Sequence, residues 1–182
     1  MLYLQQSLGP NEKLVHIGRF HWMYTCAAIM SIVWGVIGCV AVIVGSVYVL
    51  NSFISPGIYD SVSFIEAARL LHPGIRLSAF FVFIMGLMRF AQMMVTKATT
   101  EIAVTTNRLI YKRGLVARYI GEMSIDRIEG VNVLQTIMGR LLGYGRIMVR
   151  GMGVGEVILP PLSNPILFRK AIENARARHD AK

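Results

Sequence analysis

Two carboxylates three residues apart, Asp126 and Glu129, are of the type that supports general acid–base chemistry. Such a pair acts catalytically when a nucleophile or a proton relay stands beside it. No histidine, serine or cysteine lies near them in a recognisable catalytic arrangement, and Arg127 lies between them. We therefore expect a solvated strand end, no catalytic residue, no enzymatic activity and no small-molecule substrate.

The glycines at 151, 153 and 155 form the sequence GMGVG, a pattern that can cradle a phosphate. A phosphate-binding loop is followed by a helix, whose N-terminus faces the anion. Here the following residues, 156–159, are strand-like and lead into Pro160 and Pro161. The pattern therefore favours a flexible hairpin, and we expect no bound cofactor.

The histidines and cysteines do not form a metal-ligand pattern. His16 and His21 are five residues apart, which does not place them on one helix face, and His72 and His179 are remote from them. Cys26 and Cys39 both lie in an apolar run, where small packing residues are common. We expect no metal site.

The chain has 19 basic and 10 acidic residues, which gives a formal net charge of +9. Basic side chains can contact anionic headgroups or an acidic partner, and the alternative is an ordinary solvated face. Nucleic-acid binding is disfavoured because no reading motif and no aromatic-interleaved basic helix is present. The candidate lipid or partner contacts are Arg89, Lys97, Arg108, Lys112, Arg113, Arg118, Arg140 and Arg146.

Two apolar runs must position these residues. Residues 22–50 contain no charged side chain, and residues 77–96 contain only Arg89. A helix of ~20 residues crosses the ~30 Å hydrocarbon core of a bilayer, so both runs are long enough to span. Arg89 is close enough to the end of its run to snorkel toward the headgroups, or it contacts a lipid phosphate or an acidic partner.

Small residues recur along both runs at spacings that let membrane helices approach closely. They pack the two spans against each other within one chain, or they pack against another membrane protein. The candidate helix-packing residues are Ser31, Gly35, Cys39, Ala79 and Gly86.

The chain order indicates five parts, with bounds 1–21, 22–50, 51–76, 77–96 and 97–182. Residues 51–76 are expected to form an extracytoplasmic loop with a short amphipathic helix, since Ile58, Val62, Ile65, Ala68 and Leu71 recur at helical spacing. Basic residues flank the spans on the other side, so both termini are expected in the cytoplasm. The expected location is a cytoplasmic membrane, crossed twice.

Residues 97–182 have a different pattern, in which short strands alternate with turn residues. Strands are expected at 101–104, 108–112, 116–123, 130–134, 145–150 and 156–159, with a helical turn at 136–142. Asn164 and Pro165 then begin an amphipathic helix, with Phe168 and Ile172 on its apolar stripe. The expected fold is two transmembrane helices followed by a β-sandwich or barrel closed by a C-terminal helix.

Distinctive residues accompany this order of elements, namely 101–105, Asn107, Arg108, 112–115, 125–131, Gln135, 139–145, Glu12 and the pair His21-Trp22. Together they resemble the pleckstrin-homology-like domain of YdbS-like bacterial membrane proteins, which implies a bacterial cytoplasmic membrane as the location. The resemblance implies a fold and no catalytic residue or cofactor. It favours a membrane-tethered interaction module, such as a scaffold or assembly subunit, that contacts another membrane protein or a second copy of itself. The alternatives are an anionic-lipid-binding face and an accessory subunit of a transporter or channel.

Overall fold

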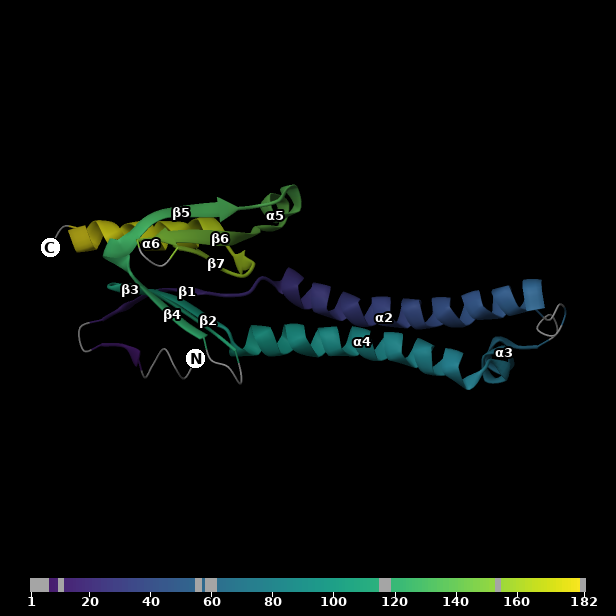
Figure 1. Cartoon of the computed structure of the whole chain (residues 1–182). Helices are drawn as coiled ribbons and strands as arrows, with labels where there is room; N and C mark the ends of the chain where they lie inside the picture. The colour runs from purple at the N-terminus through teal and green to yellow at the C-terminus, as the bar shows by residue number, and fades with distance from the viewer. Residues whose placement is uncertain are drawn as a thin grey trace. The chain divides into compact units, whose positions relative to one another are not determined.

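The computed structural model describes residues 7–9, 12–54, 57, 62–114, 119–152 and 155–180. The chain divides into two compact units, coloured by residue number in Figure 1. Met1–Tyr24 and Val95–Lys182 form a β-rich domain, and Thr25–Met94 form a helical unit. The β-rich domain is therefore discontinuous in sequence, because the helical unit is inserted into it.

The helical unit is built from two long apolar helices, α2 (Trp22–Val49) and α4 (Pro73–Thr99). A π-helical stretch, Leu50–Ile54, continues the first of them. A histidine precedes each helix and caps it: the Nδ1 atom of His21 accepts from the N–H of Met23 at 3.2 Å, and that of His72 accepts from Gly74 at 3.1 Å. These bonds satisfy backbone donors that a helix start leaves unpaired.

Helix α4 begins earlier than expected. The sequence indicates a turn at His72–Gly74 and a span from residue 77, but the structure has the helix from Pro73. The reason is that proline suits the first helical position, where its missing N–H costs nothing. The charged Arg76 therefore lies inside the helix rather than in a loop.

A short helix, α3 (Phe64–Leu70), lies between the long ones. Ser63 and Glu66 form a reciprocal capping box at its start, a pairing that satisfies two backbone donors. Ala67 and Leu71 are buried, whereas Phe64 and Ile65 are exposed. Ile58, which the sequence analysis placed on this helix, lies outside the described residues, and Val62 precedes the helix.

The first sheet of the β-rich domain has the antiparallel order β1-β2-β3-β4. Its strands are β1 (Leu14–Gly18), β2 (Glu101–Thr105), β3 (Arg108–Arg113) and β4 (Tyr119–Ser124). Strand β1 lies in the N-terminal segment, which the sequence analysis did not assign to the domain. It pairs with β2 from Leu14↔Thr105 to Gly18↔Ile102, so strands on either side of the helical unit are neighbours.

The second sheet contains β5 (Ile128–Leu134), β6 (Tyr144–Gly151) and β7 (Gly155–Ile158), and the two-residue strand β8 (Leu162–Ser163) also pairs with β6. A short 3-10 turn, η2 (Ile125–Arg127), joins the two sheets. Helix α5 (Ile137–Leu142) connects β5 to β6, with Thr136 as its N-cap and Gly143 in the left-handed conformation after it. An L side chain at that conformation would be strained, which explains the glycine.

The two sheets meet at one corner. Phe20 and Leu162 form an antiparallel bridge, and the N–H of Ser163 donates to the carbonyl of Arg19 at 2.9 Å. Strand pairing among the described residues otherwise stays within each sheet, which makes the domain a sandwich rather than a closed barrel.

Helix α6 (Pro165–Asp180) covers the core between the sheets (Figure 1). It contacts β1 and β2 of the first sheet and β5 and β6 of the second. Phe168 and Ile172 are each 1% exposed and join the main apolar cluster, as their stripe on the helix predicts. The cluster also contains Ile102, Leu109 and Ile147.

Candidate functional site

One end of the β-rich domain is defined by chain connections, and we call it the connection end. Here Gly18 pairs with Ile102, four residues before α2 begins and three after α4 ends. The chain therefore leaves for the helical unit and returns from it at neighbouring points of one sheet. Any surface at this end lies close to the first residues of α2 and the last residues of α4.

Several of the candidate basic contacts lie at the connection end. Lys112 pairs directly with Glu101, the first residue of β2, and Arg113 follows it at the end of β3. Lys97 lies in the last turn of α4. Arg113 is exposed, whereas Lys97 and Lys112 are half-buried.

Arg140 and Arg146 reach the same end from the second sheet. Arg140 is exposed in the last turn of α5, and Arg146 is exposed at the start of β6, opposite Leu134. The ring of Tyr144, between them, lies 5.2 Å from the ring of His21, the residue that caps α2. The N–H of His21 also donates to the carbonyl of Pro161 at 3.4 Å.

Arg108 lies at the opposite end of β3 and is held in an ion-pair cluster. Its Nη2 and Nε atoms donate to Glu12 at 2.8 and 3.0 Å, and its Nη1 atom donates to Glu122 at 2.7 Å. Nη2 also donates to the carbonyl of Ser7 at 2.7 Å. Through these contacts Arg108 holds the N-terminal segment against the domain. It lies away from the candidate contacts at the connection end.

The ion-pair cluster shifts the pKa values of both Glu12 and Arg108. Burial raises the pKa of Glu12, but hydrogen bonds from Arg108, Gly9 and Thr105, together with the charge of Arg108, outweigh it and hold that pKa below its ordinary value. The hydrogen bond to Glu12 raises the pKa of Arg108 further. Glu12 was part of the family resemblance in the sequence, but its pairing with Arg108 requires the tertiary fold.

The two remaining basic candidates lie elsewhere. Arg89 is exposed on α4 within the helical unit. Arg118 lies outside the described residues. The candidate set is therefore divided by the fold, and its members at the connection end are Lys97, Lys112, Arg113, Arg140 and Arg146.

Small residues bring α2 and α4 into backbone contact. A Cβ atom built on Gly86 would lie 2.8 Å from the Cα of Gly35 and 2.8 Å from the carbonyl oxygen of Ser31. The hydroxyl of Ser31 also donates to the carbonyl of Gly86 at 3.3 Å. Ala79 is buried and Cys39 is half-buried in the same unit.

A groove along the outer side of β1 was missed by the sequence analysis. It has a volume of about 530 Å³. Its walls are β1 and the start of α6, with Leu14 and Leu167 exposed in it and Arg19 beside them. No local signal predicts it, because it forms only when the N-terminal segment becomes an edge strand.

The side chains that the sequence offered for catalysis or metal binding lie apart from one another or are engaged in packing. Asp126 and Glu129 are exposed near η2, and His16 packs edge-on against Phe168 with the ring centres 5.7 Å apart. Gly153 lies outside the described residues, and a strand, β7, follows it. Among the residues that the structure describes, no group of three or more histidine, cysteine, aspartate or glutamate side chains could hold a metal ion.

The family model described as "Bacterial PH domain" matches residues 14–176. The matched region begins at the first residue of β1 and encloses both long helices and most of α6. No curated protein and no solved structure gave a significant match.

Proposed function

This chain belongs to the bacterial PH domain family, and we propose that it is a membrane-anchored scaffold. In this proposal α2 and α4 cross the bacterial cytoplasmic membrane, and the β-rich domain is a cytoplasmic, non-catalytic interaction module. Its task is to hold a protein partner at the membrane surface during assembly of a complex.

The composition and exposure of the helices support the membrane assignment. Both are long and apolar enough to cross a bilayer, over Trp22–Phe53 and Pro73–Thr99. Large apolar side chains such as Trp34, Leu77 and Phe81 are exposed along them. Apolar surface of this extent would be unfavourable in water but is compatible with lipid chains.

Charge placement supports an orientation. Arg19 and Lys97 lie in the β-rich domain beside the ends of the spans, three residues before α2 and in the last turn of α4 respectively. In the segment between the spans, residues 51–76, Asp60 and Glu66 offset Arg69 and Arg76. Basic residues next to membrane spans favour the cytoplasmic side, so the β-rich domain belongs there.

The observation that carries the proposal is the insertion of the helical unit between two hydrogen-bonded strands. A domain attached by one flexible linker can reorient freely. Here Gly18 and Ile102 are paired, and only short segments separate them from α2 and α4. Two short attachments at one end restrict the domain to the membrane surface, which suits a fixed platform for a partner.

The β1 groove is the place where we expect the partner to bind. Strand β1 is the edge of the first sheet, and an edge strand can accept an extended peptide while an adjacent groove receives its side chains. Leu14 and Leu167 offer apolar contact and Arg19 offers a positive charge. An extended segment with apolar residues and one carboxylate would complement this lining.

Site-specific photocrosslinking tests the scaffold proposal in cells. A photoreactive phenylalanine analogue at Leu167 should trap one defined protein, and the product should disappear when Leu14→Asp is added to disrupt the groove. The matched control places the analogue at Ile158, which is also exposed but lies on β7. Equal products from both positions, or none from Leu167, would contradict the proposal. A transporter or channel subunit as the trapped partner would identify the complex as a transport complex.

A further inference from the structure

Helix α5 exposes an apolar surface that the scaffold proposal does not use. Ile137 is 87% exposed, Leu141 is 79% exposed and Met138 is 56% exposed. Leu134, at the end of β5 just before the helix, is also exposed. Four large apolar side chains on and beside one short helix exceed the scattered exposure that is normal for a soluble surface. We call these four residues the α5 patch.

The backbone geometry holds this patch outward. Gly139 is buried, and a Cβ atom on it would lie 2.7 Å from the carbonyl oxygen of Tyr144, so the helix packs closely on the start of β6 through its glycine. The side chain of Gln135 donates to the same carbonyl at 3.1 Å, and Thr136 caps the helix through the N–H of Gly139 at 3.1 Å. The contacts of Gly139, Gln135 and Thr136 therefore hold the helix on the domain. Its apolar side chains are not used for this packing, so they can contact a surface outside the domain.

The charged residues nearest to the patch in the sequence are basic. Arg140 and Arg146 are both exposed beside it. The sequence contains no acidic residue between Glu129 and Glu156. Apolar side chains bordered by basic ones match the boundary of an anionic bilayer, where acyl chains lie beneath negatively charged headgroups.

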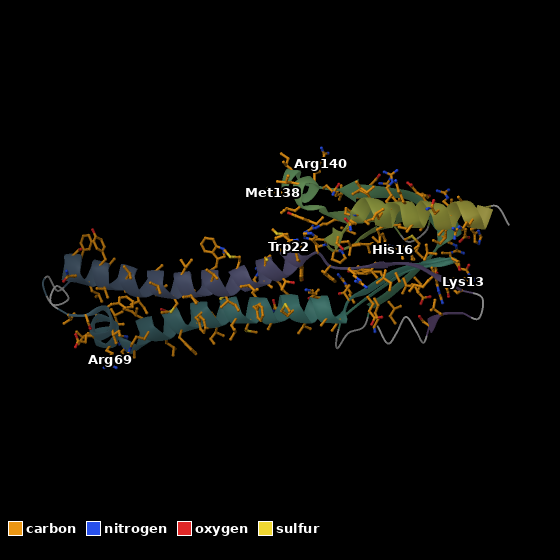
Figure 2. All side chains as sticks on the ribbon, turned by 180° about the vertical axis from the view of Figure 1, so that it is seen from behind. Lys13, His16, Trp22, Arg69, Met138 and Arg140 are labelled. Atoms are coloured by element: carbon orange, nitrogen blue, oxygen red, sulfur yellow. The ribbon has the colours of Figure 1, made fainter. Side chains whose placement is uncertain are left out.

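The position of the patch at the connection end favours a bilayer as the surface that it contacts. The ring of Tyr144 lies 5.2 Å from the ring of His21, the residue that caps α2, and this contact places the corner between α5 and β6 at the connection end of the domain. Figure 2 shows Met138, Arg140 and Trp22 together at one end of the β-rich domain and Lys13 at the other. Trp22 is the first residue of α2, so this end of the β-rich domain is the one from which the chain enters α2.

We infer that the α5 patch inserts into the headgroup boundary of the membrane that α2 spans, with Arg140 and Arg146 on anionic lipid. The inference rests on the proposed membrane anchoring. A third contact added to the two chain attachments restricts the tilt of the domain relative to the membrane plane. The β1 groove then faces its partner in one orientation.

The test uses the full chain, because β1 would be missing from a fragment that begins after α4. Cys26 and Cys39 are replaced by alanine, and a single cysteine carries an environment-sensitive fluorophore. The labelled positions are Met138→Cys on α5 and Met152→Cys as the matched control. Met152 is 59% exposed and lies just beyond the other end of β6. The protein is reconstituted in phosphatidylcholine vesicles with or without phosphatidylglycerol, and nitroxide-headgroup lipid is the quencher.

The label at Met138 should emit at shorter wavelength and be quenched by the nitroxide lipid, whereas the label at Met152 should not. Quenching at Met138 should decrease when phosphatidylglycerol is omitted or when Arg140→Gln and Arg146→Gln are combined. Ile137→Glu with Leu141→Glu should reduce it to the Met152 level; both positions are exposed, so the fold should tolerate them. Absence of quenching at Met138, including shielding of the patch by a second copy of the chain, would overturn the inference.

A third label separates this inference from membrane anchoring. Met88→Cys lies on α4 and is 58% exposed. A nitroxide in the acyl chain should quench it if α4 spans the bilayer. Quenching at Met88 without quenching at Met138 refutes only the α5 contact. Absence of quenching at Met88 refutes the anchoring itself.

Discussion

Replacing Glu12 by glutamine removes the negative charge that pins the N-terminal segment to the domain. The Glu12 side chain is 4% exposed and accepts hydrogen bonds from Arg108, Thr105 and the backbone of Gly9. In the Glu12→Gln variant the amide oxygen can still accept hydrogen bonds. The NH2 group, however, replaces the other carboxylate oxygen and faces N–H or O–H donors that it cannot accept from. The variant therefore loses charge-assisted bonds and keeps the side-chain volume.

The magnitude follows from the surroundings of Arg108. Removing one partner of a fully buried ion pair costs about 3–5 kcal/mol, because the other charge is stranded. Arg108 is 28% exposed and keeps Glu122 at 2.7 Å, so its charge is not stranded. The expected cost is nearer that of a hydrogen bond to a charged group, about 2 kcal/mol. At about 1.4 kcal/mol per factor of ten, this corresponds to a roughly 30-fold loss of protection of the β1 amides against hydrogen exchange.

Amide hydrogen exchange of β1 measures this loss in the reconstituted full chain. Strand β1 is the element that the cluster pins, so exchange at Val15–Gly18 should accelerate more than exchange in β3. The matched control is Arg150→Gln, which removes the exposed pair with Glu156 and should have little effect, since exposed pairs contribute little. Unchanged exchange in β1, or equal acceleration in the control, would refute the role of the cluster.

The same variant predicts a pH dependence. The pKa of Glu12 is lower in the folded protein than its ordinary value of 4.5. Its contribution to stability is therefore complete above the unfolded pKa and is lost as the pH falls through the folded pKa. The protection factor of the β1 amides, which is the intrinsic exchange rate at each pH divided by the observed rate, should fall in the unmodified chain on acidification below about pH 4.5, and Glu12→Gln should lack this component.

Three further predictions concern the core, the helical unit and the topology. Phe168→Ala should cost about 3–5 kcal/mol and make the β-rich domain protease-sensitive without preventing membrane insertion, whereas the exposed Leu167→Ala should leave proteolysis unchanged. Gly86→Val should force α2 and α4 apart and lower the thermal stability of the detergent-solubilised chain; Gly45→Val, where a Cβ meets nothing within 4 Å, is the control, and equal stability of the two would exclude the contact. In a background without native cysteines, Arg69→Cys on α3 should react with a membrane-impermeant reagent in intact cells. Labelling only after permeabilisation of the cells would indicate the opposite topology, with α3 on the cytoplasmic side.

The sequence was sufficient for elements whose signal is local. The apolar runs predict α2 and α4 because helix-spanning length and lack of charge are properties of consecutive residues. The stripe with Phe168 and Ile172 predicts both α6 and its buried face, since helical periodicity fixes which side chains share a side. Strands β2 and β3 were likewise indicated by alternation and by the turn between them.

The functional surfaces depend on pairings that local patterns do not encode. Strand β1 is short, and only its partner β2, on the far side of the helical unit, makes it part of the sheet. That pairing creates the groove and brings Glu12 to Arg108, 96 positions later in the chain. Arg108 and Lys112 are four residues apart on one strand, and distant parts of the chain give them different surroundings: Arg108 contacts Glu12 and Glu122, whereas Lys112 pairs with Glu101 on β2. Composition and periodicity determined what the elements are, whereas hydrogen bonding between distant strands decided which side chains share a surface, because only the folded chain brings those strands together.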